Sequence, residues 1–138
     1  MAKRVALERG GKLGREVGYT IRFDDQSDLL KTRIKYVTDG ILVRECLIDP
    51  DLKSYSVVVL DEAHERSLNT DILFALVKQA VVRRQGTLRL VVTSATLRTD
   101  QLSKYYFGCP LLSVSGRCYP VAILHQESPK EQRVEVTV

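Results

Sequence analysis

Two adjacent carboxylates follow a short apolar run near the middle of the chain. Residues 57–60 read Val-Val-Val-Leu, and Asp61 and Glu62 come directly after them. A continuous apolar run of this length is typical of a strand buried on both faces of a parallel sheet, and ligands bind beyond the carboxyl ends of such strands. Because Mg²⁺ needs only one or two carboxylates when phosphates and water supply its other ligands, the pair predicts a site for Mg²⁺ and a phosphate. Glu62 is also placed to polarise a water that attacks a terminal phosphate.

A structural role explains the same two carboxylates just as simply. Acidic side chains near the start of a helix complement the helix dipole, and a helix is expected to begin a few residues after Glu62. Asp61 and Glu62 alone therefore leave the metal-binding and the helix-capping interpretations open.

Hydroxyl side chains follow the next apolar run. Residues 88–92 read Leu-Arg-Leu-Val-Val, and Ser94, Ala95 and Thr96 come after one further residue. Because the carboxyl ends of parallel strands meet at one edge of a sheet, we expect the hydroxyls of Ser94 and Thr96 to face Asp61 and Glu62. A helix-capping turn is the structural alternative for these hydroxyls.

Two further features carry candidate chemistry. Thr38, Asp39 and Gly40 precede an expected helix, whose free N–H groups can hold a phosphate, although the same residues also suit a plain helix cap. His64 begins like the zinc motif H-E-x-x-H, but position 68 is Leu, so the second metal ligand is missing. A structural role is the simpler interpretation of a single histidine.

The elements expected around these residues alternate between strands and helices. Strands are expected over 17–23, 33–37, 56–60, 88–92, 111–114 and 121–125, helices over 1–9, 41–48, 67–83 and 102–107, and a polar loop over 24–28. This alternation predicts an α/β fold with a parallel sheet flanked by helices.

Composition narrows the class of protein. The chain has 138 residues, of which 44% are hydrophobic and 28% charged, as in one folded domain or part of one. The net charge of +4 equals the excess within residues 1–22, where six basic residues face two acidic ones. This segment is either a solvated surface or one wall of a nucleic-acid groove.

Cysteine usage and hydropathy exclude several further classes. The three cysteines form no C-x-x-C pair, so we expect neither a zinc site nor a disulfide framework, and a reducing compartment fits best. No apolar run approaches the roughly 20 residues of a membrane span, and no secretory signal is visible. We therefore expect a protein that is neither in a membrane nor secreted.

The motifs together resemble one family. Residues 57–73, VVVLDEAHERSLNTDIL, are similar to the Walker B segment of DEAH-box ATP-dependent RNA helicases, and residues 61–64 match the family's name letter for letter. Residues 94–96 resemble the SAT motif of these helicases, and residues 38–40 resemble their TDG segment. Residues 12–25 and 105–121 look like the family as well, so the resemblance covers nearly the whole chain.

This resemblance implies a fold and a role for each motif. The fold would be a partial RecA-like domain that lacks the P-loop strand, with residues 1–125 as the C-terminal part of the ATP-binding domain and 126–138 as the start of the connection to a second domain. Asp61 and Glu62 would hold Mg²⁺, and Glu62 and His64 would act in catalysis. Ser94 and Thr96 would couple nucleotide hydrolysis to strand movement, and Thr38, Asp39 and Gly40 would bind RNA.

The sequence departs from the family at the phosphate-binding loop. The motif G-x-x-x-x-G-K-[ST] is absent: Gly11-Lys12 is followed by Leu13, and Ala6 occupies the place of the first glycine. The resemblance implies a parent enzyme that uses ATP or another NTP with Mg²⁺ to unwind RNA or remodel ribonucleoproteins, whereas this chain alone is expected to be inactive. It also implies an activating protein partner and a nuclear, otherwise cytoplasmic, location. A truncated RNA- or cofactor-binding isoform and a gene-model fragment are the alternatives.

Overall fold

The structure is a computed structural model that describes residues 1–95, 99–114, 116, 119 and 121. Its elements are α1 (Ala2–Glu8), β1 (Val17–Ile21), β2 (Asp24–Gln26), β3 (Ile34–Val37), α2 (Asp39–Ile48), β4 (Val57–Leu60), the 3₁₀ turn η1 (Ala63–Glu65), α3 (Leu68–Arg83), β5 (Arg89–Val92) and α4 (Thr99–Tyr105). Helices and strands alternate as the sequence predicts, so the α/β class is confirmed.

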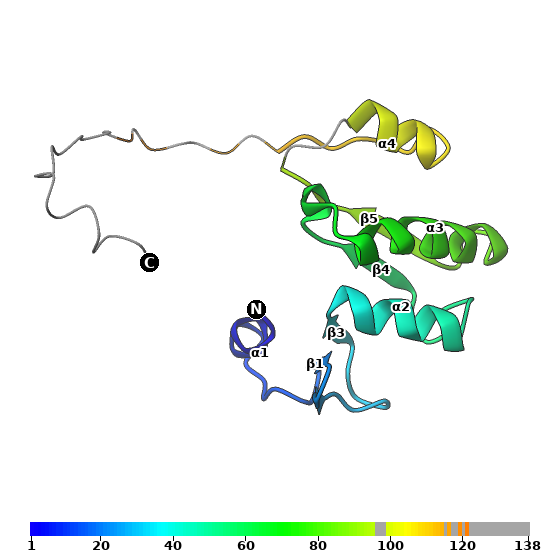
Figure 1. Cartoon of the computed structure of the whole chain (residues 1–138). Coiled ribbons are helices and arrows are strands. Elements are labelled where there is room, and N and C mark those ends of the chain that lie inside the picture. The colour runs from blue at the N-terminus through cyan, green and yellow to red at the C-terminus, as the bar shows by residue number, and fades with distance from the viewer. Residues whose placement is uncertain (96–98, 115, 117–118, 120, 122–138) are drawn as a thin grey trace, which may run out of the picture.

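The strands form two small sheets. In the first, with the order β2-β1-β3, β1 pairs parallel with β3 and antiparallel with β2; in the second, β4 and β5 are parallel. Figure 1 shows α2 lying between the first sheet and α3. Helix α3 lies in the connection between β4 and β5, whereas the connection between β1 and β3 contains β2, and α1 packs against β1.

Strand β2 lies in the segment expected to be a polar loop, so that prediction is wrong. Arg22 and Phe23 form a two-residue turn that returns the chain along β1, with Ile21 opposite Asp24. Gly18 lets the two backbones approach, since a Cβ there would lie 2.5 Å from the Gln26 carbonyl oxygen. The all-polar composition of the strand hid it, because strand prediction relies on apolar or β-branched residues.

The expectation that the strand before Asp61 is buried on both faces is also wrong for this chain. Val58 and Leu60 are buried against α3, whereas Val57 is 48% exposed and Val59 is 55% exposed. Only the face toward α3 is covered by residues that the structure describes. The apolar run therefore alternates between a covered and an uncovered face.

Some of the predictions for the C-terminal part of the chain are wrong, and others lie outside the described residues. Helix α4 begins at Thr99, three residues earlier than expected, and residues 111–114 are not a strand. Residues 122–125 of the last expected strand and the proposed boundary at 125/126 lie outside the described residues. Within the described part of the chain, no helix is both long and apolar enough to cross a bilayer.

A partly buried polar network joins the first sheet to α2. The Lys35 ammonium on β3 lies 2.7 Å from a Glu45 carboxylate oxygen on α2, and the Tyr55 hydroxyl donates to the other oxygen at 2.7 Å. Burial, together with the hydrogen bond to Glu45, raises the pKa of Tyr55 to about 12. The three side chains thus connect β3, α2 and the segment before β4.

This network predicts an alkaline weakening of the fold. The pKa of Tyr55 rises from 10.0 to about 12 on folding, so the neutral phenol stabilises the fold below pH 10, and that contribution is lost as the pH rises toward 12. Replacing Tyr55 with Phe should cost about 1.5 kcal/mol near neutral pH through the lost hydrogen bond to a carboxylate. Urea unfolding between pH 8 and about 11 should show a steeper decline for the wild type than for Y55F; parallel declines would contradict this role.

The uncovered face of β4 and β5 predicts self-association of the isolated chain. Val57, Val59 and Val91 are exposed on one face of a two-stranded sheet, and no other strand among the described residues pairs with its outer edges. A V57T/V59T variant keeps side-chain shape and strand propensity, and light scattering should show a larger monomer fraction than for the wild type. Leu29→Thr, at a loop position that is 97% exposed, is the control and should change nothing. A monomeric wild type with a sharp cooperative melt would count against this expectation.

Candidate functional site

Asp61 is fixed from the neighbouring strand. Leu60 lies opposite Val92 in the parallel pair of β4 and β5, so Asp61 and Thr93 follow side by side at the same sheet edge. The Thr93 hydroxyl donates a hydrogen bond to Asp61 Oδ1, and the Thr93 N–H donates to the Leu60 carbonyl at 2.9 Å. The hydroxyl facing Asp61 thus belongs to Thr93, which the sequence analysis missed although equal strand ends point to it.

The sequence names the hydroxyls of Ser94 and Thr96 instead. Ser94 is exposed just beyond the end of β5, and Thr96 lies outside the described residues. The expected facing of these two hydroxyls toward Asp61 and Glu62 stays a prediction. The Ala95 N–H between them donates toward His64 Nδ1 at 3.4 Å, so the backbone of this segment does reach the turn after β4.

The turn that carries Glu62 and His64 has an unusual backbone. Glu62 has φ 52° and ψ 38°, and Arg66, at the other end of η1, has φ 50° and ψ 46°. Both are left-handed conformations, which cost a residue with a side chain roughly 1–2 kcal/mol. Ala63 is fully buried, and its N–H donates to the Thr93 carbonyl at 3.0 Å. This buried anchor holds the turn in its strained form.

His64 has two competing contacts at one nitrogen. Its Nδ1 lies 3.3 Å from Glu62 Oε2 and 3.4 Å from the Ala95 amide nitrogen. An Nδ1 without a hydrogen accepts the Ala95 N–H, whereas an Nδ1 that carries a hydrogen donates to the Glu62 carboxylate. The two contacts therefore exclude each other at this nitrogen.

The residues after the turn form their own hydrogen bonds. Arg66 makes a bidentate pair with Asp71, with nitrogen–oxygen distances of 2.6 and 3.0 Å. Ser67 caps α3 by accepting the Thr70 N–H at 3.1 Å. The guanidinium of Arg66 is thus held against α3 rather than directed at the carboxylates of the site.

The Thr38–Gly40 segment lies at the N-terminus of α2, beside the start of α3. Thr38 and Gly40 are exposed, and Thr38 makes no side-chain cap. The Asp39 carboxylate instead accepts hydrogen bonds from Ser67 and Thr70 on α3. This segment and the turn after β4 are therefore linked through α3.

Known proteins similar to this chain share one activity in their names. "Pre-mRNA-splicing factor ATP-dependent RNA helicase prp22" of Schizosaccharomyces pombe is 50% identical over 138 residues, which is 100% of this chain and 12% of that protein. "Probable ATP-dependent RNA helicase DHX35" of Homo sapiens is 49% identical over 148 residues, covering 100% of this chain and 21% of that protein. The protein of the same name from Pongo abelii is 49% identical over 148 residues, which cover 100% of this chain and 20% of that protein.

The chain is homologous to DEAH-box ATP-dependent RNA helicases. The family resemblance seen in the motifs is thereby confirmed, and the α/β architecture agrees with part of a RecA-like helicase domain. No family model matches the chain. This chain spans only 12% to 21% of the length of these relatives.

The carboxylates of Asp61 and Glu62 are candidate ligands for a divalent cation. Asp61 and Glu62 are both exposed, and Asp61 Oδ2 accepts no hydrogen bond from a residue that the structure describes. Across that same part of the chain, no three His, Cys, Asp or Glu side chains gather where they could hold a metal. Two carboxylates without further protein ligands fit Mg²⁺, which takes its remaining ligands from water and phosphate oxygens.

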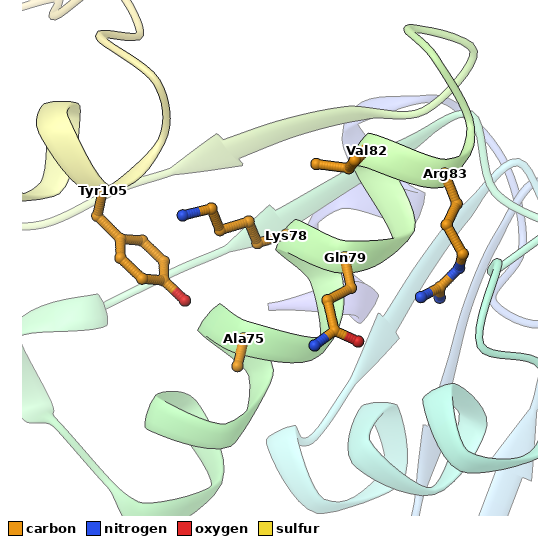
Figure 2. Close-up of a pocket in the computed structure, with 6 residues that line it drawn as sticks. All are labelled: Ala75, Lys78, Gln79, Val82, Arg83 and Tyr105. Carbon is orange, nitrogen blue, oxygen red and sulfur yellow. The ribbon is translucent and has the colours of Figure 1, made fainter.

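A surface hollow of about 400 Å³ lies apart from this site. Ala75, Lys78, Gln79, Val82 and Arg83 of α3 line it together with Tyr105 of α4, as Figure 2 shows. The Lys78 ammonium lies 3.8 Å from the centre of the Tyr105 ring, which satisfies the charge locally. None of the candidate site residues lines this hollow. Asp61, Glu62 and His64 precede the N-terminus of α3, whereas the hollow lies toward its C-terminal end.

The strained backbone of Glu62 predicts a difference between two substitutions that both remove its carboxylate. Glycine adopts φ 52° without penalty, whereas alanine retains a Cβ, so E62G should be about 1 kcal/mol more stable than E62A. Thermal unfolding of both variants measures the difference. The same exchange at Glu65, which lies inside η1, is the control and should favour alanine. A more stable E62A would contradict the left-handed conformation.

Proposed function

We propose that this chain is part of an enzyme that couples hydrolysis of ATP, or of another NTP, to the unwinding of RNA or the remodelling of ribonucleoproteins. The relatives are named ATP-dependent RNA helicases and are about 50% identical over the whole chain. The supporting observation is the position of Asp61 and Glu62 directly after β4. Thr93, which follows β5, donates a hydrogen bond to Asp61. Nucleotide phosphates bind at such sheet edges.

The two carboxylates divide the work of the nucleotide site. Asp61 Oδ2 and the exposed Glu62 carboxylate would hold Mg²⁺, which when bound neutralises charge on the phosphates. Glu62 would also orient the attacking water and accept its proton. The hydrogen bond from Thr93 keeps Asp61 in one orientation, and the buried Ala63 keeps Glu62 beside it. Positioning of this kind supplies much of the rate of phosphoryl transfer.

His64, Ser94 and Thr96 would couple the nucleotide site to RNA. The contact between His64 Nδ1 and the Ala95 N–H lies within the 94–96 segment, so a change at Glu62 can reach that segment through the imidazole. The hydroxyls of Ser94 and Thr96 would respond to the state of the Asp61–Glu62 pair. This coupling role rests on the resemblance of both motifs to the helicase family.

RNA would bind at the N-terminus of α2. Thr38 and Gly40 are exposed there, and the backbone N–H groups of residues 38–40 open the helix. Such groups attract a phosphate because the helix dipole leaves a partial positive charge at this end. The basic segment 1–22 would add a sequence-independent attraction.

The cellular setting follows from the relatives. One relative is named a pre-mRNA-splicing factor, which supports a role in mRNA splicing and a nuclear location. A protein that activates the helicase is a further expected partner. A non-catalytic isoform that binds RNA or a cofactor is the alternative.

The full-length protein that contains this chain provides the decisive test. Replacing Glu62 with Gln removes the base but keeps side-chain shape, so the steady-state ATPase rate should fall by about 100-fold or more. E65Q, an exposed substitution on the same turn, is the matched control and should stay near wild-type activity.

One outcome would contradict this proposal, namely a full-length E62Q protein that hydrolyses ATP at the wild-type rate. Hydrolysis of ATP by the isolated 138-residue chain would contradict only the expectation that this chain alone is inactive.

A further inference from the structure

A cluster of hydroxyls around one carboxylate joins the N-termini of α2 and α3. Asp39 Oδ2 accepts a hydrogen bond from Thr70 Oγ1 at 2.6 Å and from Ser67 Oγ at 3.3 Å. The Ser67 and Thr70 hydroxyls also lie 2.7 Å apart. Thr70 is only 5% exposed, and the partners lie 28 and 31 residues from Asp39 in sequence. The cluster is thus a tertiary contact with a desolvated member.

The position of Asp39 suits it to hold both helices. It lies in the first turn of α2, and its carboxylate reaches the cap residue of α3. Both helix N-termini carry partial positive charge, so one carboxylate between them stabilises the two together. Close packing at this point is also visible at Gly40, where an added Cβ would lie 3.6 Å from Asn69 Nδ2.

The cluster is one residue away from the strained turn of the nucleotide site. Ser67 follows Arg66, whose left-handed backbone ends η1, and η1 begins directly after Glu62. Asp39 is therefore connected to the turn with Glu62 and His64 through its contact with Ser67 and the backbone of Arg66. The other end of the path is the α2 N-terminus, where Thr38 and Gly40 are exposed.

We propose that Asp39 is a positioning residue that transmits RNA binding at the α2 N-terminus to the Glu62–His64 turn through Ser67 and Thr70. This inference rests on the proposed helicase function and refines one assignment in it. A carboxylate beside an RNA phosphate is repelled, so the Asp39 side chain serves α3, while the exposed backbone of Thr38 and Gly40 faces RNA.

The test uses the full-length protein containing this chain and compares ATP hydrolysis with and without saturating RNA. Thr70→Val keeps side-chain shape and removes the hydroxyl that Asp39 accepts from. RNA-free turnover of T70V should stay within about twofold of wild type. Its stimulation by RNA should fall about tenfold, within the usual range of coupling between two sites.

Three further variants separate positioning from other roles. T70S restores the hydroxyl and should recover stimulation. D39A should lose stimulation as T70V does, without weaker RNA binding, and the D39A/T70V double variant should be no worse than either single variant because both remove the Asp39–Thr70 hydrogen bond. Asp51→Asn breaks the 2.7 Å contact to Arg83 at the other end of α3. It should lower the melting temperature and leave stimulation unchanged.

The outcomes separate this inference from the proposed function. A wild-type protein without RNA-stimulated hydrolysis would overturn the proposed function and this inference with it. A stimulated wild type with unchanged stimulation in T70V and D39A would overturn only the inference. So would a D39A variant with at least tenfold weaker RNA binding but full stimulation at saturating RNA, since Asp39 would then contact RNA directly.

Discussion

The register between β4 and β5 is the constraint on which the candidate site depends. Pairing of Leu60 with Val92 ends both strands at one level, so Asp61 and Thr93 emerge together and their side chains form a hydrogen bond. Two backbone hydrogen bonds continue this pairing past the strands. The Thr93 N–H donates to the Leu60 carbonyl, and the Ala63 N–H donates to the Thr93 carbonyl. A slip of one residue would turn Val58 and Leu60 away from α3 and separate the carboxylate from the hydroxyl.

Backbone strain is concentrated where the two carboxylates are presented. Glu62 and Arg66 both adopt left-handed conformations on either side of a three-residue turn, and the full burial of Ala63 between them holds the turn closed. Strain that persists at such a turn is often tied to the geometry a reaction needs. Here the observed geometry brings His64 Nδ1 within reach of both the Glu62 carboxylate and the Ala95 amide.

Two polar clusters join the parts of the chain at opposite ends of α2. Asp39 binds the start of α3 at one end, and Glu45 binds Lys35 and Tyr55 toward the other. Leu42 and Cys46 of the same helix pack into the hydrophobic core. These contacts fix α2 between the first sheet and α3, and α3 follows the turn that begins after Asp61.

Sequence alone determined the α/β class, the order of most elements and the place of the Asp61–Glu62 pair, because these depend on local periodicity and on residue types at strand ends. The family resemblance of residues 57–73 was readable for the same reason. Only the tertiary structure decided that Thr93 binds Asp61, that Asp39 faces α3, and that residues 24–26 pair with β1. Those facts arise from strand register and helix packing between residues up to 32 positions apart, and local sequence patterns do not encode such contacts.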